Sequence, residues 1–279
     1  MIERLMKKWF LLVFLCLWFS VSFSWNMVGH RVVAQIAYDN MTHEAKQKFN
    51  ALNHALDSEY SPKSFVNAAS WMDEIKYREI KIYDPWHYID IPFSPDGTSL
   101  PDVPKVNAVW ALDQAALLLM SEKTTDYEKG FFLRVFIHVL GDLHQPLHTV
   151  DRITEKHPAG DRGGNLFYLG TNKVADNLHS YWDRGAGLFS AKNTRYTNKK
   201  IKQIAARLEK KYPLSSANLT FNGFDVWANE SNLLAKEIVY AIDEGEKPSK
   251  AYQRKARRAV EKQAVLAGYR LAALLNGMV

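Results

Sequence analysis

The sequence has 279 residues, 47 % of them hydrophobic, and a formal net charge of +6. This composition agrees with a globular fold, and the length suits one domain with a large core. The modest basic excess would help an anionic substrate to approach, but a solvated surface explains it equally well, so charge alone identifies no partner. The single cysteine, Cys16, excludes an intramolecular disulfide, so stability must come from the core or from bound metal.

The first 24 residues have the order of a secretory signal peptide. Basic residues such as Arg4 and Lys8 precede an apolar run over residues 9–19, and small residues follow up to Ser24. The run is far shorter than the roughly 20 residues that a membrane-spanning helix needs. We therefore predict cleavage after Ser24, a mature domain of residues 25–279 without a stable membrane anchor, and export to a periplasm or to the medium.

Helical periodicity dominates the remaining chain and predicts a single, mainly helical, all-α domain. Thr42, Ser64 and Asp225 stand where helix N-caps are expected, and Gly130 is expected to mark a gap between helices. Apolar residues recur three and four positions apart in the segments 29–39, 42–55, 64–78, 106–121, 127–144, 198–211, 225–243 and 251–275.

Extended structure is expected in two short places. One is the aromatic-rich segment 86–91, and the other is a minor β-hairpin with residues 166–169 as one strand. Residues 151–165, rich in glycine, form the longest irregular stretch, and a long loop in a compact domain is often functional.

The strongest chemical signal lies in residues 138–148. His138 and Asp142 are four residues apart and share one face of a helix, where both side chains can reach one metal ion. Pro146 discourages continuation of that helix, so His148 is expected on a turn that points it toward a second ion.

The same spacing recurs at His179 and Asp183, on an expected short helix. A lone histidine on an apolar helix is more often a core residue, but two imidazole and carboxylate pairs at one spacing favour metal binding. Asp73 and His87 are further candidates upstream. Taken alone, they are explained as well by an exposed helix carboxylate and a partly buried strand histidine.

Together these residues resemble the zinc-dependent type I nucleases, the nuclease S1/P1 family, over essentially the whole mature length. That family is related in fold to zinc-dependent phospholipase C. The resemblance rests on Trp25, His30, residues 70–73, residues 87–90, His138, Asp142, His148, residues 163–165 and residues 177–183.

The resemblance implies a cleft with three zinc ions per chain. Asp73, His87, His138 and Asp142 would hold one ion of a close pair, and Asp142 would bridge to the other. The second ion would take the α-amino nitrogen and carbonyl oxygen of Trp25 together with His30. The third ion would take His148, His179 and Asp183.

The resemblance also implies hydrolysis of single-stranded RNA and DNA to 5′-phosphorylated products, with 3′-nucleotides as further substrates. Asp73 and Asp142 would act in catalysis through the metal. Lys76 stands where better-known members carry an arginine that contacts the phosphate, so the charge survives but the bidentate fork does not. Tyr88 would stack on a base, and Asp90 would be the acidic partner of Lys76. Ordinary core packing of Tyr88 and an exposed Lys76 without a role are the alternatives.

Two other functions stay open at this point. Zinc-dependent phospholipase C shares the fold and most ligands but usually ends its last motif with glutamate, and Asp183 favours a nuclease. An exported zinc-binding protein without catalysis is the second alternative. The missing disulfides fit a bacterial member of the family, and we expect a monomer.

Overall fold

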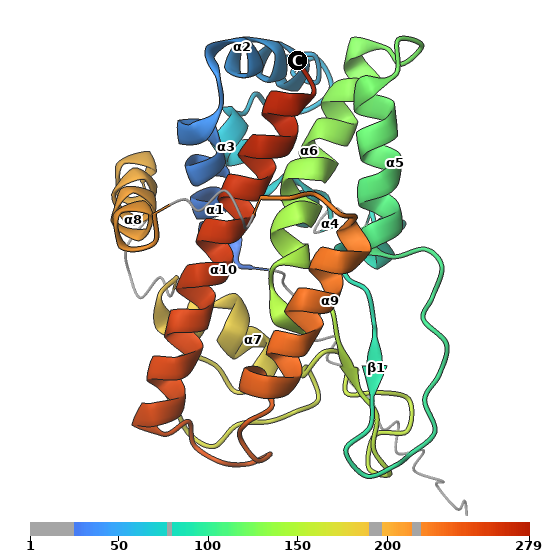
Figure 1. The fold of residues 1–279 in the computed structure, drawn as a ribbon, viewed down its shortest axis with the longest axis vertical. Helices are drawn as coiled ribbons and strands as arrows, with labels where there is room; N and C mark the ends of the chain where they lie inside the picture. Colours follow the sequence, from blue (N-terminus) through green and yellow to red (C-terminus); the bar gives the residue numbers. More distant parts are fainter. Residues whose placement is uncertain (1–24, 77–79, 190–196, 214–218) are drawn as a thin grey trace, which may run out of the picture.

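A computed structural model describes residues 25–76, 80–189, 197–213 and 219–279. The predicted signal peptide lies outside these residues. The described part is mainly helical, as predicted. Its longer helices are α1 (Met27–Asn40), α2 (His43–His54), α5 (Ala108–Met120), α6 (Asp126–Leu143), α8 (Asn198–Lys211), α9 (Phe224–Leu234) and α10 (Lys250–Gly277). Helices α5, α6 and α10 run roughly along the long axis of the molecule, and α2 lies across one end (Figure 1).

Short elements connect these helices. They are the helices α3 (Phe65–Ala68), α4 (Trp71–Lys76) and α7 (Leu178–Asp183), the 3-10 turns η1 (Asp84–His87), η2 (Pro146–His148) and η3 (Gly185–Gly187), the π-helical turn η5 (Ala235–Val239), and the strands β1 (Pro92–Phe93) and β2 (Asp151–Arg152). None of the described helices is long and apolar enough to cross a membrane.

The core forms where α6 and α10 pack against their neighbours. Helix α5 lies along α6, and α1 lies along α10. Gly268 permits this second contact, because a Cβ atom there would meet the Ile36 Cβ at 2.6 Å. Gly130 was wrongly predicted to separate helices. It lies inside α6, where its missing side chain lets the helix approach the Leu52 carbonyl oxygen, which a Cβ would meet at 2.3 Å.

The predicted helix over residues 64–78 is two helices, α3 and α4, as far as residue 76, and its last two residues lie outside the described part of the chain. Ser64 is the N-cap of α3, as expected, and Thr42 is the N-cap of α2. The break falls at Ala69 and Ser70. It matters for the site, because the carbonyl oxygen of Ala69 accepts a hydrogen bond from the His138 ring. The third predicted cap was wrong: Gly223 precedes α9, and Asp225 lies in its first turn.

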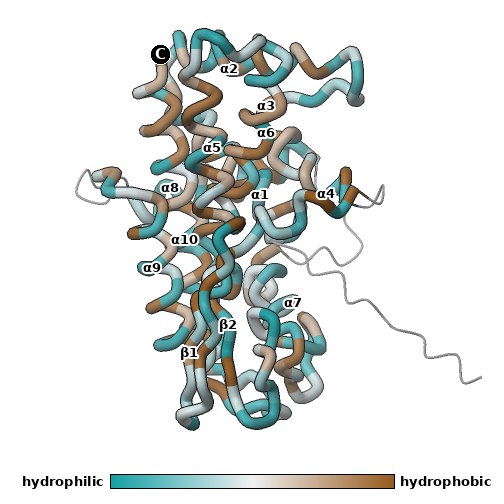
Figure 2. The backbone as a smooth tube through the Cα atoms, turned by 90° about the vertical axis from the view of Figure 1, so that its right-hand side faces the viewer, coloured by the Kyte–Doolittle hydropathy of each residue, from teal (hydrophilic) through white to brown (hydrophobic). Residues whose placement is uncertain are grey.

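The extended segments also differ from expectation. Residues Asp84–His87 form the 3-10 turn η1, with Pro85 at its start, and the backbone becomes extended at Tyr88. Strands β1 and β2 are parallel, whereas the predicted hairpin is reduced to one antiparallel bridge between Tyr168 and Asn177. In the view turned by 90°, β1 and β2 lie side by side, and the long helices carry both hydrophobic and hydrophilic residues (Figure 2).

Candidate metal centre

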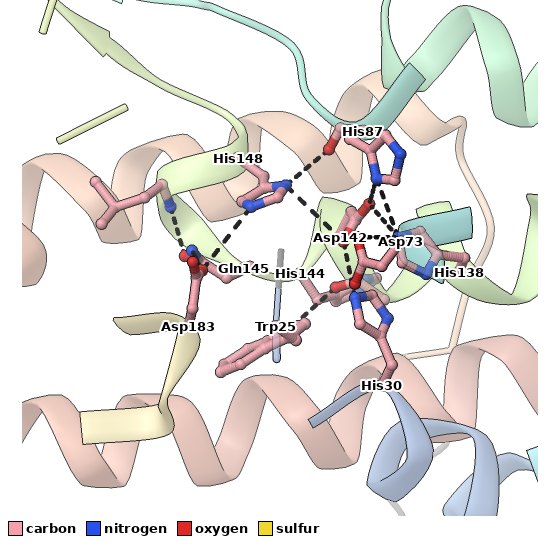
Figure 3. A network of polar contacts seen from close by, with 12 residues as sticks. Trp25, His30, Asp73, His87, His138, Asp142, His144, Gln145, His148 and Asp183 are labelled. Carbon is pink, nitrogen blue, oxygen red and sulfur yellow. Dashed lines mark hydrogen bonds and ion pairs between the residues drawn. The ribbon is translucent and has the colours of Figure 1, made fainter. Parts of the chain in front are cut away.

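The centre of the site is the buried C-terminal half of α6. His138 and Asp142 are both fully buried, and the helix places His138 Nε2 3.2 Å from Asp142 Oδ2. The spacing of four residues therefore does bring the two side chains together. Histidines from several elements point toward Asp142 (Figure 3).

A first group consists of Asp73, His87 and His138, contributed by α4, η1 and α6. The Nδ1 atom of His87 lies 3.0 Å from Nε2 of His138 and 3.1 Å from Asp142 Oδ2. Asp73 Oδ1 is 3.8 Å from the same nitrogen of His138. One ligand atom from each member lies within 4.8 Å of the others, so the group could hold one metal ion.

A second group consists of His30, His138 and Asp142. His30 comes from α1, and its Nε2 atom lies 3.2 Å from Asp142 Oδ1. Its ring stacks on that of His138, with ring centroids 3.9 Å apart. Gly141 makes room for it, because a Cβ there would meet His30 Nδ1 at 3.0 Å. The two oxygens of Asp142 therefore face different groups, which is the arrangement that a bridging carboxylate needs.

A third group consists of His148, His179 and Asp183, on η2 and α7. His179 Nε2 lies 3.3 Å from Asp183 Oδ2, and His148 Nε2 lies 3.9 Å from Asp183 Oδ1. All three side chains are buried. Pro146 starts the turn that carries His148, so the predicted change of direction after α6 is confirmed.

Backbone carbonyl groups fix the orientation of three of the histidine rings. A carbonyl oxygen can only accept, so the Nδ1 atom of each ring carries a proton, and in the neutral ring Nε2 keeps the lone pair that can bind a metal. The bonds run from His138 to Ala69 (2.6 Å), from His148 to His87 (2.7 Å) and from His179 to Gly163 (2.7 Å).

His144 shows what a buried histidine without a metal role looks like in this chain. Its Nδ1 atom donates to the Leu140 carbonyl at 2.9 Å, and its Nε2 atom accepts from Arg270 at 3.0 Å. By contrast, His148 Nε2 and Asp183 Oδ2 are buried and make no hydrogen bond with any described residue. A cation between these two atoms would satisfy both.

The charges of the site fit metal binding. Burial raises the pKa of Asp183 well above its usual range, and a bound cation would oppose this effect because it favours the ionised carboxylate. Burial lowers the pKa of His148 to about 3, so its ring is neutral and able to bind a metal at pH 7. Burial also opposes ionisation of Asp142, but the His138 and His30 rings beside it outweigh that effect and lower its pKa well below the usual range. Imidazole nitrogens and carboxylate oxygens are a donor set that suits zinc.

Trp25 is the first residue that the structure describes, and it lies beside these groups. Its side chain is fully buried, and the indole Nε1 donates to the Gly141 carbonyl at 2.9 Å. The next backbone N–H, that of Asn26, donates to the carbonyl oxygen of Asp183 at 3.1 Å. Trp25 and Asn26 are thus held between α6 and α7. Ligation of zinc by the Trp25 backbone stays a prediction.

The predicted substrate-binding residues lie next to η1. Tyr88 follows His87, and the residue is 38 % exposed. Burial, together with Asp151 and Asp161, raises the pKa of Asp90 to about 7. Lys76 forms an ion pair with Asp84 at 3.5 Å.

Sequence reasoning missed three contributors to the site. Asp84 forms an ion pair with Lys76, and no motif had singled it out. The Ala69 carbonyl leaves no trace in the sequence, since it is a backbone group. Gln145 could have been noticed, because it lies three residues before His148 in the same motif.

The family model described as S1/P1 Nuclease matches residues 25–279. Nuclease S1 of Aspergillus oryzae (strain ATCC 42149 / RIB 40) is 26 % identical in an alignment that covers 92 % of each protein. Endonuclease 4 of Arabidopsis thaliana is 27 % identical over 90 % of this chain and 88 % of its own length. Nuclease P1 of Penicillium citrinum is 26 % identical over 57 % of each chain. The matched region begins at Trp25 and contains every candidate ligand.

Proposed function

Because this chain belongs to the S1/P1 Nuclease family and is therefore a nuclease, we propose that it is an exported, monomeric, zinc-dependent endonuclease that hydrolyses single-stranded RNA and DNA. Its products would carry 5′-phosphates, and 3′-nucleotides would be further substrates. The observation that carries this proposal is the convergence of three groups of buried imidazole and carboxylate ligands around Asp142.

We assign these residues to three zinc ions as the family resemblance implies. Asp73, His87, His138 and Asp142 would hold the first ion. Asp142 would also reach the second ion, shared with His30 and with the backbone nitrogen and oxygen of Trp25. The third group, formed by His148, His179 and Asp183, would hold the third ion. Bound zinc would supply a water of lowered pKa and positive charge against the phosphate oxygens.

The protein's own residues would then bind and orient the strand. Tyr88 is an exposed residue, and its ring would stack on a base, which is a contact that tolerates any sequence. Lys76 would direct a single positive charge at the phosphate, and Asp84 would hold its side chain in place. Asp90, whose pKa is about 7, would carry its proton for part of the time near neutral pH and could then donate it in a hydrogen bond to the substrate.

Removal of the predicted signal peptide would be part of activation. A peptide bond before Trp25 leaves an amide nitrogen, which is not basic enough to bind zinc, whereas cleavage leaves an amine. The buried Trp25 indole and the Asn26 backbone bond to Asp183 already hold this residue beside the site.

Two measurements on purified protein that begins at Trp25 test the proposal. Zinc is counted per chain, and cleavage is followed on single-stranded and duplex nucleic acid of equal length, on a 3′-nucleotide and on phosphatidylcholine. We expect three zinc ions and preferential cleavage of the single strands. Hydrolysis of phosphatidylcholine with intact single strands would instead favour a phospholipase C, and zinc binding without hydrolysis of any phosphate ester would favour the non-catalytic alternative.

A matched pair of variants tests the role of the amino terminus. A chain that retains Ser24 before Trp25 should lose one zinc ion and most of its activity. A chain with one serine added after Val279 should keep the zinc content and the activity of the wild type. Full activity and full zinc content in the first variant would contradict ligation by the Trp25 backbone.

A further inference from the structure

Gln145 lies beside the third group and makes two short hydrogen bonds there. Its side chain is fully buried. The Nε2 atom donates to Asp183 Oδ1 at 2.7 Å, and Oε1 accepts the backbone N–H of Leu147 at 2.7 Å. Because a backbone N–H can only donate, the amide can adopt only one of its two orientations. The NH2 group of Gln145 must therefore face Asp183.

These two bonds join the two elements that carry the third group. The bond to Leu147 caps η2, the turn on which His148 lies. The bond to Asp183 reaches α7, which also carries His179. A single side chain thus links the turn that carries His148 to the helix that carries His179 and Asp183.

The bond from Gln145 also determines which carboxylate oxygen is left for a metal ion. Gln145 occupies Oδ1 of Asp183. The other oxygen, Oδ2, is buried and has no hydrogen bond within the described chain, and the same holds for His148 Nε2. Without the amide, the carboxylate could rotate about its last bond, and either oxygen could turn away from the two imidazole rings.

We propose that Gln145 is a positioning residue that orients Asp183 and so sets the zinc affinity of the third group, with little effect on the first and second groups. The proposal rests on the proposed function only in that the third group must bind zinc. Glutamine is suited to this position because one side chain offers both a donor and an acceptor. Glutamate would place a second carboxylate against Asp183, and methionine would remove both bonds.

The test compares Gln145→Met and Gln145→Glu with a matched control, Gln35→Met. Gln35 is also buried and also donates to a carboxylate, that of Asp39 at 2.8 Å, but it lies on α1. Purified proteins are dialysed against increasing chelator, and the zinc ions retained per chain are counted by native mass spectrometry. We expect each Gln145 variant to release one ion at a free-zinc level about 10–100-fold higher than wild type. The other two ions should be retained as in wild type, and Gln35→Met should retain all three.

A double variant separates positioning from packing. Asp183→Asn should already lose the third ion, so adding Gln145→Met should cause no further loss of zinc. A purely structural role would lower the melting temperature of the metal-free protein and release all ions together, and that result would overturn the proposal. Unchanged zinc retention in both Gln145 variants would overturn it too.

The same data separate this proposal from the proposed function. If Asp183→Asn retains as many ions as wild type, Asp183 is not a required zinc ligand, and both the proposed ligand set of the third group and the role of Gln145 fail. If Asp183→Asn loses one ion but the Gln145 variants do not, only the role of Gln145 is wrong. Should Gln145→Met fail to fold, the isosteric Gln145→Glu decides the question.

Discussion

Replacing Trp25 with phenylalanine removes one hydrogen bond beside the site and leaves most of the packing in place. The indole N–H donates to the Gly141 carbonyl, directly before Asp142, and its ring meets Phe189 edge to face at 5.5 Å. The lost bond costs about 1 kcal/mol, and the smaller ring leaves a cavity worth roughly 1–2 kcal/mol more. In a domain of this size that lowers the melting temperature by roughly 5–10 °C.

The informative quantity is the difference in the free energy of unfolding between Trp25→Phe and wild type, compared without and with zinc. If the indole positions the amino terminus for zinc, the variant also binds zinc more weakly. A tenfold loss of affinity at saturating zinc then widens the stability gap by about 1.4 kcal/mol. The assay is thermal unfolding of both proteins, metal-free and with excess zinc.

Trp227→Phe serves as the control for loss of a buried indole elsewhere. Trp227 is also buried, but it lies on α9 and contacts Arg270. We expect the stability gap of this control to be the same with and without zinc. An equal gap in both conditions for Trp25→Phe as well would refute the reasoning, because the indole would then be core packing without a bearing on the metal.

Three further predictions concern the substrate side of the site. Tyr88→Ala should raise KM for single-stranded DNA about 5–100-fold, the effect of losing one stacked base, while Tyr88→Phe should not; equal KM values would rule out stacking. Lys76→Arg restores the bidentate fork and should raise kcat/KM several-fold in steady-state kinetics, and no change would mean that Lys76 does not contact the phosphate. The third prediction concerns Asp90, whose pKa is about 7 in the folded protein against 3.8 when unperturbed. Between these two values the folded protein retains a proton that the unfolded chain releases. The stability contributed by Asp90 therefore falls as pH rises from about 4 to 7. Chemical denaturation should therefore show that the free energy of unfolding of Asp90→Asn, relative to that of wild type, rises between pH 5 and pH 8. The expected rise is on the order of 1–2 kcal/mol, because solvent partly screens the group. A difference that does not depend on pH would contradict this.

Local geometry explains which parts of the site could be predicted. An α-helix brings residues four apart onto one face whatever surrounds it, so the pairs His138 with Asp142 and His179 with Asp183 follow from spacing alone. The structure gives 3.2 and 3.3 Å for these two contacts. The turn at His148 follows from the missing backbone donor of Pro146 in the same way.

Contacts between distant segments could not be predicted from spacing. Lys76 forms an ion pair with Asp84 of η1, a residue that no motif in the sequence singled out. Gly130 sits inside a helix because α2 packs closely against it. The break between α3 and α4 also conflicts with the helical pattern of residues 64–78, and it places the Ala69 carbonyl against His138.

The sequence by itself determined the helical class of the fold, the two imidazole and carboxylate pairs and the family resemblance, because these depend on residue type and on spacing within one element. Only the tertiary structure decided how the pairs become a centre. It brought His30, Asp73 and His87 from α1, α4 and η1 around Asp142, and it placed the Gln145 amide against Asp183. Some of these contacts, such as that between His30 and Asp142, join residues more than a hundred positions apart. Their geometry depends on how whole helices pack rather than on any local preference of the chain.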